Sequence, residues 1–366
     1  MPHTLVPARP VLSASRAAGS AIRVMLVDDS LTTRTIFSRI ITAEGDMVLA
    51  GQATTAEAAL VQLEQARPDV VLLDLEMPGM GGMRALPQLL ALAPGTQVLV
   101  VSSLTEIGAR HTIEALSAGA ADTLLKPLPG SFNREYREQL LQKIRVLGRP
   151  DRLVLASAAQ PAITRPASHN GTGKPARLVA IGASTGGVHA INTVLRALPA
   201  SFTLPIIITQ HLPASFVPVF AHQLQAASGR MAQVADAGTP LKPGTITVAP
   251  GDAHMLVRSV GKGLATELST APAPAGCWPA VDPMLASVAD ACEGAAAALI
   301  LSGMGRDGLI GASALHKAGG TVLAQDAQSC AVWGMPRAVA AAGIAAGTMP
   351  PEQMASWLLA HAQVAA

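Results

Sequence analysis

Aromatic residues make up only 2% of this 366-residue chain, so alanine, leucine, valine and isoleucine must build its cores. Charged residues are also scarce, at 14%, while hydrophobic residues reach 50%, a balance that excludes an intrinsically disordered chain. The formal net charge is only +2, which gives no electrostatic reason to expect nucleic acid as a partner. The length suits two ordinary domains, each able to bury its own core.

Cysteine is scarce as well, with Cys277, Cys292 and Cys330 the three in the chain. They are too few and too scattered for a disulfide framework or a zinc site, which favours reduced cysteines in a cytoplasmic protein. No apolar run approaches the length of a membrane span, so we expect no direct membrane insertion. Residues 1–21 contain several prolines and no continuous apolar stretch, which predicts a disordered tail rather than a signal peptide.

Short apolar runs alternate with helical segments in the first part of the chain. Such alternation predicts an α/β domain with a parallel five-stranded sheet that is buried on both faces. In sheets of this kind, ligands bind beyond the carboxyl ends of the strands. The predicted strands are Ile22–Val27, Met47–Ala53, Val70–Leu75, Gln97–Ser103 and Asp122–Pro127.

Polar residues occupy the carboxyl ends of four of these predicted strands: Asp28, Asp29, Asp74, Ser102 and Lys126. Three carboxylates that converge on one sheet edge repel one another unless a hard cation lies among them, and Mg²⁺ has the required preference for oxygen. A lysine and a hydroxyl group opposite them can hold a phosphoryl group. Taken alone, Asp-Asp-Ser is also a good helix N-cap, but that reading does not explain all five positions.

This arrangement resembles the receiver domain of response regulators, which has a flavodoxin-like strand order. The resemblance implies that Asp74 accepts a phosphoryl group from a chemotaxis histidine kinase. It also implies that Asp28, Asp29, Asp74 and the backbone of Glu76 hold the Mg²⁺ needed for phosphorylation.

The same resemblance makes Ser102 and Lys126 the residues that sense the phosphoryl oxygens. Two positions depart from the family pattern. Thr123 stands where receivers often carry an aromatic switch residue, and Gly81-Gly82 replaces the usual Asp-Gly. Because Thr123 is not aromatic, it leaves open whether this receiver signals through a change in the rotamer of an aromatic residue.

Helical character ends near Gly148, and from about Ala156 to Pro175 the residues Ala, Pro, Ser, Thr, Gly and Asn dominate. This composition is typical of a flexible linker. We therefore predict a receiver domain over residues 22–148, a linker over 149–176 and a second domain over 177–366.

The second domain carries one serine, one histidine and one aspartate at turns that follow apolar runs: Ser184, His211 and Asp307. A nucleophile, a base and an orienting carboxylate are what a serine hydrolase requires. The glycine-rich turn around Ser184 fits a nucleophile elbow, but alone it fits a phosphate-binding turn equally well. His211 and Asp307, which follow later in the chain, favour the hydrolase over the phosphate-binding turn. Because the acid follows the histidine, this order excludes the α/β-hydrolase fold and predicts a Rossmann-like, mainly parallel sheet.

The segments AIGASTGG, ITQHLP, VAPGDAHM and SGMGRDG closely resemble those of CheB-type protein-glutamate methylesterases. That resemblance implies demethylation of glutamate γ-methyl esters on the cytoplasmic helices of chemoreceptors, together with deamidation of receptor glutamines. It gives Ser184, His211 and Asp307 the catalytic roles, without a cofactor for hydrolysis. We assign oxyanion stabilisation to the backbone N–H of Met304, in a flexible glycine loop.

Two other functions remain open from the sequence alone. One is a non-enzymatic regulator, which the intact triad disfavours; the other is a receiver-controlled esterase or amidase with a different target.

We expect a monomer in which the unphosphorylated receiver covers Ser184. Asp282-Pro283 is typical of a helix N-cap followed by proline. The segment before it, from Cys277, departs from the family pattern and leaves receptor preference open.

Overall fold

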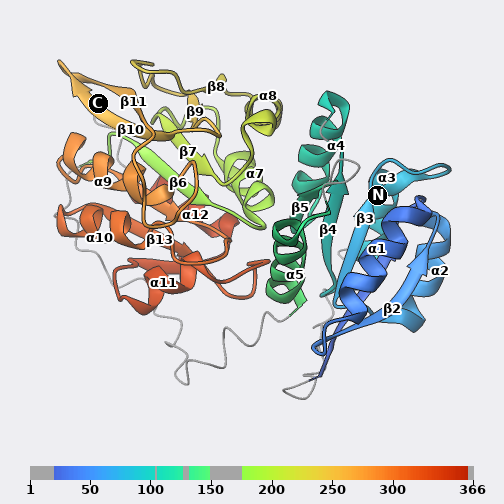
Figure 1. The fold of residues 1–366 in the computed structure, drawn as a ribbon. Helices are drawn as coiled ribbons and strands as arrows, with labels where there is room; N and C mark the ends of the chain where they lie inside the picture. The colour runs from blue at the N-terminus through green and yellow to red at the C-terminus, as the bar shows by residue number, and fades with distance from the viewer. Residues whose placement is uncertain (1–19, 104, 127–131, 149–174, 362–366) are drawn as a thin grey trace, which may run out of the picture.

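The structure is a computed structural model that describes residues 20–103, 105–126, 132–148 and 175–361. Residues 1–19 of the predicted disordered tail and residues 149–174 of the predicted linker lie outside the described residues. Figure 1 shows the described elements in two α/β regions, each built on its own sheet. Among the described helices, none combines the length and apolar character needed to cross a membrane.

The first region contains a parallel five-stranded sheet in the order β2-β1-β3-β4-β5, which confirms the flavodoxin-like prediction. Its three central strands, β1, β3 and β4, are almost continuously apolar and buried because helices cover both faces. The strands are β1 Ile22–Val27, β2 Met47–Ala53, β3 Val70–Asp74, β4 Gln97–Ser102 and β5 Asp122–Leu125. The helices are α1 Leu31–Thr42, α2 Ala56–Ala66, α3 Gly81–Leu92, α4 Glu106–Ser117 and α5 Arg134–Gly148.

The second region contains a seven-stranded parallel sheet in the order β14-β13-β12-β6-β7-β9-β8, and an antiparallel hairpin, β10-β11, lies beside it. The mainly parallel Rossmann-like prediction is therefore confirmed. The strands are β6 Val179–Ala183, β7 Ile206–Gln210, β8 Ala232–Val234, β9 Ile246–Val248, β10 His254–Val260, β11 Gly263–Ser269, β12 Ala297–Ile300, β13 Thr321–Gln325 and β14 Gly347–Met349.

Helices cover the faces of this second sheet as well (Figure 1). They are α7 Gly187–Ala197, the 3-10 turn η1 Ala214–Phe216, α8 Val217–Ser228, α9 Val281–Ala291, α10 Leu309–Lys317, α11 Met335–Ala341 and α12 Pro351–His361. Helix α9 begins at Val281 with Ala280 as its N-cap, so the prediction that Asp282 caps this helix is wrong.

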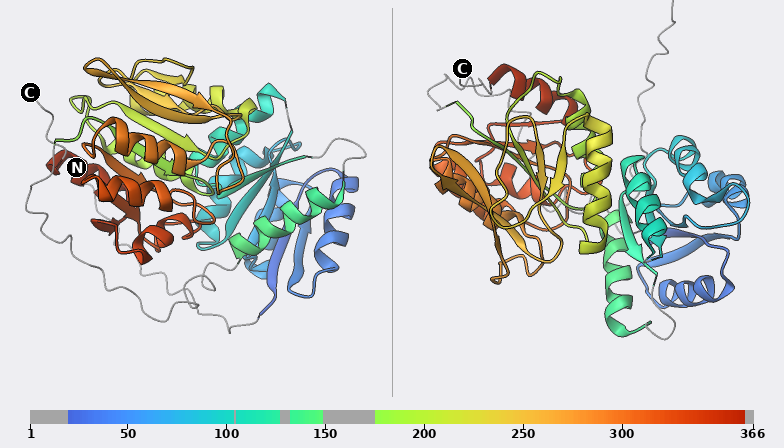
Figure 2. Two further views of the ribbon diagram at one scale, coloured as in Figure 1. Left: turned by 60° about the vertical axis from the view of Figure 1, so that its left-hand side comes forward. Right: turned by 90° about the horizontal axis from the view of Figure 1, so that it is seen from above.

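The two regions are in contact. Helix α4 of the first region packs on α7, α8 and η1 of the second, and α5 contacts the loop that carries Met304. Figures 1 and 2 show this arrangement. Hydrophobic side chains on α4 belong to one continuous buried cluster with those of α7 and α8. This contact places the first region next to the carboxyl ends of β6 and β7.

Candidate active site and phosphorylation site

Ser184 and His211 follow neighbouring parallel strands. Ala183, the last residue of β6, is paired with Gln210, the last residue of β7. The His211 N–H donates to the Ala183 carbonyl oxygen, and the Gln210 side-chain amide donates to the Ser184 carbonyl oxygen at 2.8 Å. Strand pairing therefore brings the predicted nucleophile and base to one edge, although no hydrogen bond joins these two side chains among the described residues.

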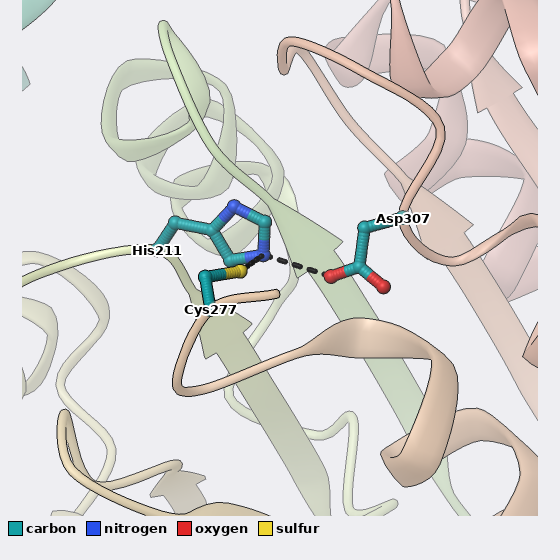
Figure 3. A group of neighbouring side chains, drawn as sticks. All are labelled: His211, Cys277 and Asp307. Atoms are coloured by element: carbon teal, nitrogen blue, oxygen red, sulfur yellow. Dashed lines mark hydrogen bonds and ion pairs between the residues drawn. The ribbon is translucent and has the colours of Figure 1, made fainter. Parts of the chain in front are cut away.

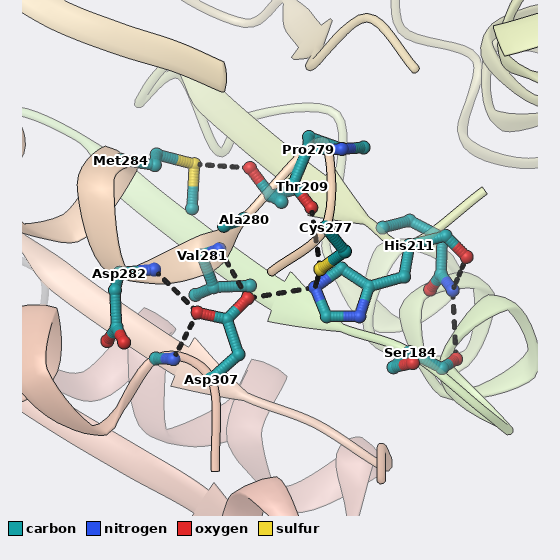
Figure 4. Close-up of polar contacts among 12 residues, drawn as sticks. Ser184, Thr209, His211, Cys277, Pro279, Ala280, Val281, Asp282, Met284 and Asp307 are labelled. Carbon is teal, nitrogen blue, oxygen red and sulfur yellow. Dashed lines mark hydrogen bonds and ion pairs between the residues drawn. The ribbon is translucent and has the colours of Figure 1, made fainter. Parts of the chain in front are cut away.

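His211 and Asp307 are in direct contact. The imidazole Nε2 lies 2.8 Å from Oδ2 of Asp307, and the other ring nitrogen, Nδ1, faces the Ser184 side (Figure 4). The carboxylate is almost completely buried, whereas the His211 side chain is 20% exposed. The arrangement leaves Nδ1 as the nitrogen able to exchange a proton with a group at Ser184.

Backbone amides hold the Asp307 carboxylate in place. Oδ2 accepts the N–H of Val281 at 2.6 Å, and Oδ1 accepts the N–H groups of Asp282 at 3.0 Å and Gly308 at 2.9 Å. Two of these donors belong to the first turn of α9, whose N–H groups have no partner within the helix. Gly308, rather than Asp307, is the N-cap of α10.

These contacts shift both ionisable groups toward an ion pair. Burial raises the pKa of Asp307, but the hydrogen bonds from His211 and the backbone N–H groups lower it more. Burial opposes the charged form of His211, yet hydrogen bonds to Asp307 and Cys277 outweigh it and raise the imidazole pKa to about 9. The resting site therefore favours an imidazolium beside a carboxylate at neutral pH.

The glycine loop after β12 packs directly on Ser184. A Cβ atom added to Gly303 would lie 2.9 Å from Ser184 Cβ, so only glycine permits this approach. The Gly303 N–H donates to the Val332 carbonyl oxygen at 3.0 Å, which leaves the next amide, that of Met304, as the neighbouring donor of this loop. The position suits the predicted oxyanion role of the Met304 N–H.

Cys277 is a neighbour of the site that the sequence did not reveal. Its Sγ lies 3.9 Å from His211 Nε2 and 3.7 Å from the carbonyl oxygen of Pro279 (Figure 3). The only sequence signal was its position just before Asp282, in the segment that departs from the family pattern. Gln210, which fixes the backbone of Ser184, was missed as well because a glutamine at the end of a strand has no distinctive pattern.

The first sheet gathers its predicted polar residues at one edge. Oxygen atoms of Asp28, Asp29 and Asp74 all lie within 4.8 Å of one another. Lys126 Nζ lies 2.5 Å from Asp74 Oδ2 and 3.7 Å from Asp28 Oδ2. The N–H of Glu76 donates to Asp74 Oδ1 at 3.0 Å.

The carboxylates at this edge fit a magnesium ion. Burial raises the pKa values of Asp28 and Asp74, although Lys126 acts in the opposite direction on both. Asp28 Oδ2 is buried without a hydrogen-bond partner, and so is the Ser102 hydroxyl. Unpaired buried acceptors beside like charges are the ligands that a hard cation would satisfy. The hydroxyl of Thr123, a residue of β5, is also buried without a hydrogen-bond partner.

The first region reaches the loop that carries Ser184. The Gly186 N–H donates to the Ala121 carbonyl oxygen at 2.6 Å, and the Thr185 hydroxyl donates to Asp122 Oδ2 at 2.7 Å. Met304 packs against the hydrophobic cluster of the first region, and its Sδ lies 3.8 Å from Gln142 Nε2 on α5. Both the nucleophile loop and the oxyanion loop are thus in contact with the first region.

Comparisons with known proteins agree with this two-part organisation. A family model for the response regulator receiver domain matches residues 24–134, and one for CheB methylesterase matches residues 179–358. Protein-glutamate methylesterase/protein-glutamine glutaminase 1 of Paramagnetospirillum magneticum is 40% identical over 369 residues, which cover 93% of this chain and 96% of that one. A second such protein of Caulobacter vibrioides is 40% identical over 346 residues, covering 93% and 99%.

Solved structures include a similar domain. The CheB methylesterase catalytic domain of Thermotoga maritima is 34% identical, and the match covers 50% of this chain and 98% of that one with a TM-score of 0.49. The fold and the sequence matches together define a receiver domain joined to a methylesterase domain that is built on a parallel sheet. The chain belongs to the family of CheB methylesterases.

Proposed function

We propose that this chain hydrolyses glutamate γ-methyl esters on the cytoplasmic helices of chemoreceptors and deamidates receptor glutamines. The observation that carries the proposal is the 2.8 Å contact between His211 and a backbone-held Asp307, beside Ser184 at the end of the neighbouring strand. The named activities of the two relatives support the choice of substrate. The reaction then belongs to the cytoplasm and resets receptor sensitivity during chemotaxis.

The proposed reaction uses Ser184 Oγ as the nucleophile. Oγ attacks the γ-carbonyl carbon, its proton passes to Nδ1 of His211, and the N–H of Met304 stabilises the oxyanion. His211 then gives the proton to the departing methanol, or to ammonia from a glutamine. A water molecule releases the acyl group by the same two steps. Asp307 keeps Nε2 protonated throughout, so that Nδ1 accepts and returns the proton.

We also propose that phosphorylation of Asp74 by a chemotaxis histidine kinase activates the hydrolase. Asp28, Asp29, Asp74 and the Glu76 carbonyl would hold Mg²⁺, which neutralises charge during phosphoryl transfer. Lys126 and Ser102 would hold the phosphoryl oxygens. Since Lys126 pairs with the Asp74 carboxylate before transfer, phosphorylation must rearrange this contact at the end of β5. The first residues of β5 touch the nucleophile loop.

Methanol release from membranes that carry methyl-labelled chemoreceptors tests the substrate. The purified chain should release labelled methanol, and Ser184→Ala should reduce release to the background rate while keeping the same thermal unfolding profile. The matched control is Ser313→Ala, at a partly buried serine on α10. Ser302→Ala is unsuitable because the Ser302 hydroxyl donates a hydrogen bond to the carbonyl oxygen of Thr185. Equal release by the wild type and by Ser184→Ala would contradict the proposed nucleophile. An absence of release, with hydrolysis of other esters, would indicate a different target.

A further inference from the structure

Three metal-ligating side chains converge at the candidate active site from three separate segments. The Nε2 atom of His211, the Sγ atom of Cys277 and a carboxylate oxygen of Asp307 all lie within 4.8 Å of one another (Figure 3). The contact from Nε2 to Sγ is 3.9 Å, and that from Nε2 to Oδ2 is 2.8 Å. The cysteine spacing in the sequence excluded a zinc site built from cysteines, but it carried no information about this mixed cluster.

We propose that His211, Cys277 and Asp307 form an inhibitory binding site for Zn²⁺. Imidazole, thiolate and carboxylate are the three kinds of protein ligand that zinc accepts. With Zn–S near 2.3 Å and Zn–N and Zn–O near 2.0–2.1 Å, a tetrahedral ion separates its ligand atoms by about 3.3–3.6 Å. The separations of 3.9 Å and 2.8 Å need changes of only about half an ångström to reach those values.

The three residues differ in how firmly they are held and how open they are. Asp307 is fixed by three backbone N–H groups, so it provides a rigid ligand. Cys277 is partly exposed, and 20% of the His211 side chain is accessible with the first region in contact. Three protein ligands leave a fourth position for water, and an ion can reach the site without displacement of the receiver.

Zinc at this position would stop hydrolysis by changing the tautomer of His211. On binding, the Cys277 thiol releases one proton, and the imidazole gives up its Nε2 proton to make way for the metal. The neutral ring then carries its single proton on Nδ1. A protonated Nδ1 has no lone pair for the proton of Ser184, so the general base is lost although the metal never touches the serine.

Zinc binding can be measured without any substrate, so this test is independent of the proposed esterase activity. We would titrate the full chain with Zn²⁺ against a chromophoric chelator, with excess Mg²⁺ present to occupy the oxygen site of the receiver. The wild type should show one tight site, and Cys277→Ala should weaken it by roughly 100-fold or more. Cys330→Ala, which removes another partly exposed cysteine of the same domain, should leave the affinity unchanged.

Two further readouts test the ligand set and the inhibition. Co²⁺ in place of zinc should give a thiolate-to-metal charge-transfer band that disappears in Cys277→Ser. Zn²⁺ should inhibit ester hydrolysis reversibly by chelation in the wild type, and far less in Cys277→Ala relative to the metal-free rate of the same variant. Equal zinc affinity in the wild type and Cys277→Ala, or no stoichiometric site in the wild type, would overturn the proposal, whatever the substrate of the enzyme.

Discussion

The side-chain hydroxyl of Thr185 donates a hydrogen bond of 2.7 Å to Oδ2 of Asp122. Thr185 directly follows the proposed nucleophile Ser184, while Asp122 begins β5 of the receiver sheet. The same carboxylate oxygen lies 2.6 Å from Lys143 Nζ on α5. A charged group of the receiver is therefore hydrogen-bonded to the loop that carries the nucleophile.

Replacement of Asp122 by alanine should raise the basal esterase rate of the unphosphorylated chain. Loss of one such contact shifts the equilibrium between docked and undocked receiver by about 1 kcal/mol, which corresponds to roughly a fivefold increase in rate. Initial rates without a phosphodonor measure this effect. Glu44→Ala is the control, because the ion pairs of Glu44 with Arg137 and Arg145 lie within the receiver. A rate unchanged by Asp122→Ala would contradict the role of this contact.

The Asp307→Asn variant should lose nearly all activity. In the wild type, the backbone N–H groups of Val281 and Asp282 each donate a hydrogen bond to one carboxylate oxygen, and the NH₂ group of an asparagine cannot accept either bond. A neutral side chain also no longer stabilises the imidazolium. We expect a decrease in kcat of about 10⁴-fold, by analogy with the carboxylate of other serine hydrolase triads. Methanol release by Asp307→Asn measures this decrease. Activity within tenfold of the wild type would show that Asp307 is not the orienting acid.

The esterase rate should rise with pH up to about pH 9. The His211 pKa is raised to about 9, so below that pH most of the imidazole is protonated and cannot act as a base. The value of kcat/KM should increase about tenfold per pH unit on this limb and level off above it. Cys277→Ala should move the midpoint to lower pH because Cys277 contributes to the shift. A midpoint near the ordinary histidine value would contradict the ion pair seen in the structure.

The raised His211 pKa also has a consequence for folding. The folded state binds this proton more tightly than the unfolded state, so the ion pair stabilises the fold fully below the unfolded pKa of about 6.5. That contribution is lost as the pH rises through about 9. The increase in rate toward pH 9 is therefore expected to coincide with a decrease in the free energy of unfolding of the second domain.

Magnesium should stabilise the receiver, and Asp28→Asn should remove that effect. Burial raises the Asp28 pKa more than Lys126 lowers it, so at neutral pH the buried charge destabilises the fold, and Asp28→Asn should raise the melting temperature without Mg²⁺. In the wild type, Mg²⁺ at 100 times its Kd should add about 2.7 kcal/mol. Calorimetry with and without Mg²⁺ checks both effects. A melting temperature of Asp28→Asn that rises with Mg²⁺ as much as that of the wild type would contradict the assigned ligand.

Much of the fold could be predicted because its apolar pattern is local. The predicted runs over β1 and β2 coincide with the observed strands to the residue. The sequence placed Ser184 and His211 at turns after apolar runs, and the parallel pairing of β6 with β7 brings these two turns to one edge. The hydrophobic periodicity of the sequence does not predict helix ends whose backbone N–H groups are bound by side chains from distant parts of the chain. The N-cap prediction at Asp282 is wrong because the first turn of α9 donates to Asp307 instead.

The parts of the site that the sequence did not reveal depend on irregular chain segments. Asp307 itself was predicted, but it lies seven residues beyond the end of β12, and the contacts with the start of α9 that hold it were not predicted. Cys277 reaches His211 from a segment with no periodic pattern. The Thr185–Asp122 contact needs the docking of two separately folded surfaces, which no local pattern encodes.

Phosphorylation of Asp74 is proposed to relieve a contact that restrains the Ser184 loop. The most direct test compares methanol release with and without acetyl phosphate and Mg²⁺ in the wild type, Asp74→Asn and Asp122→Ala. We predict strong stimulation of the wild type, none of Asp74→Asn, and, for Asp122→Ala, a basal rate raised by roughly fivefold with a correspondingly smaller fold-stimulation. Equal stimulation of the wild type and Asp74→Asn, or no stimulation of a phosphorylated wild type, would contradict the account.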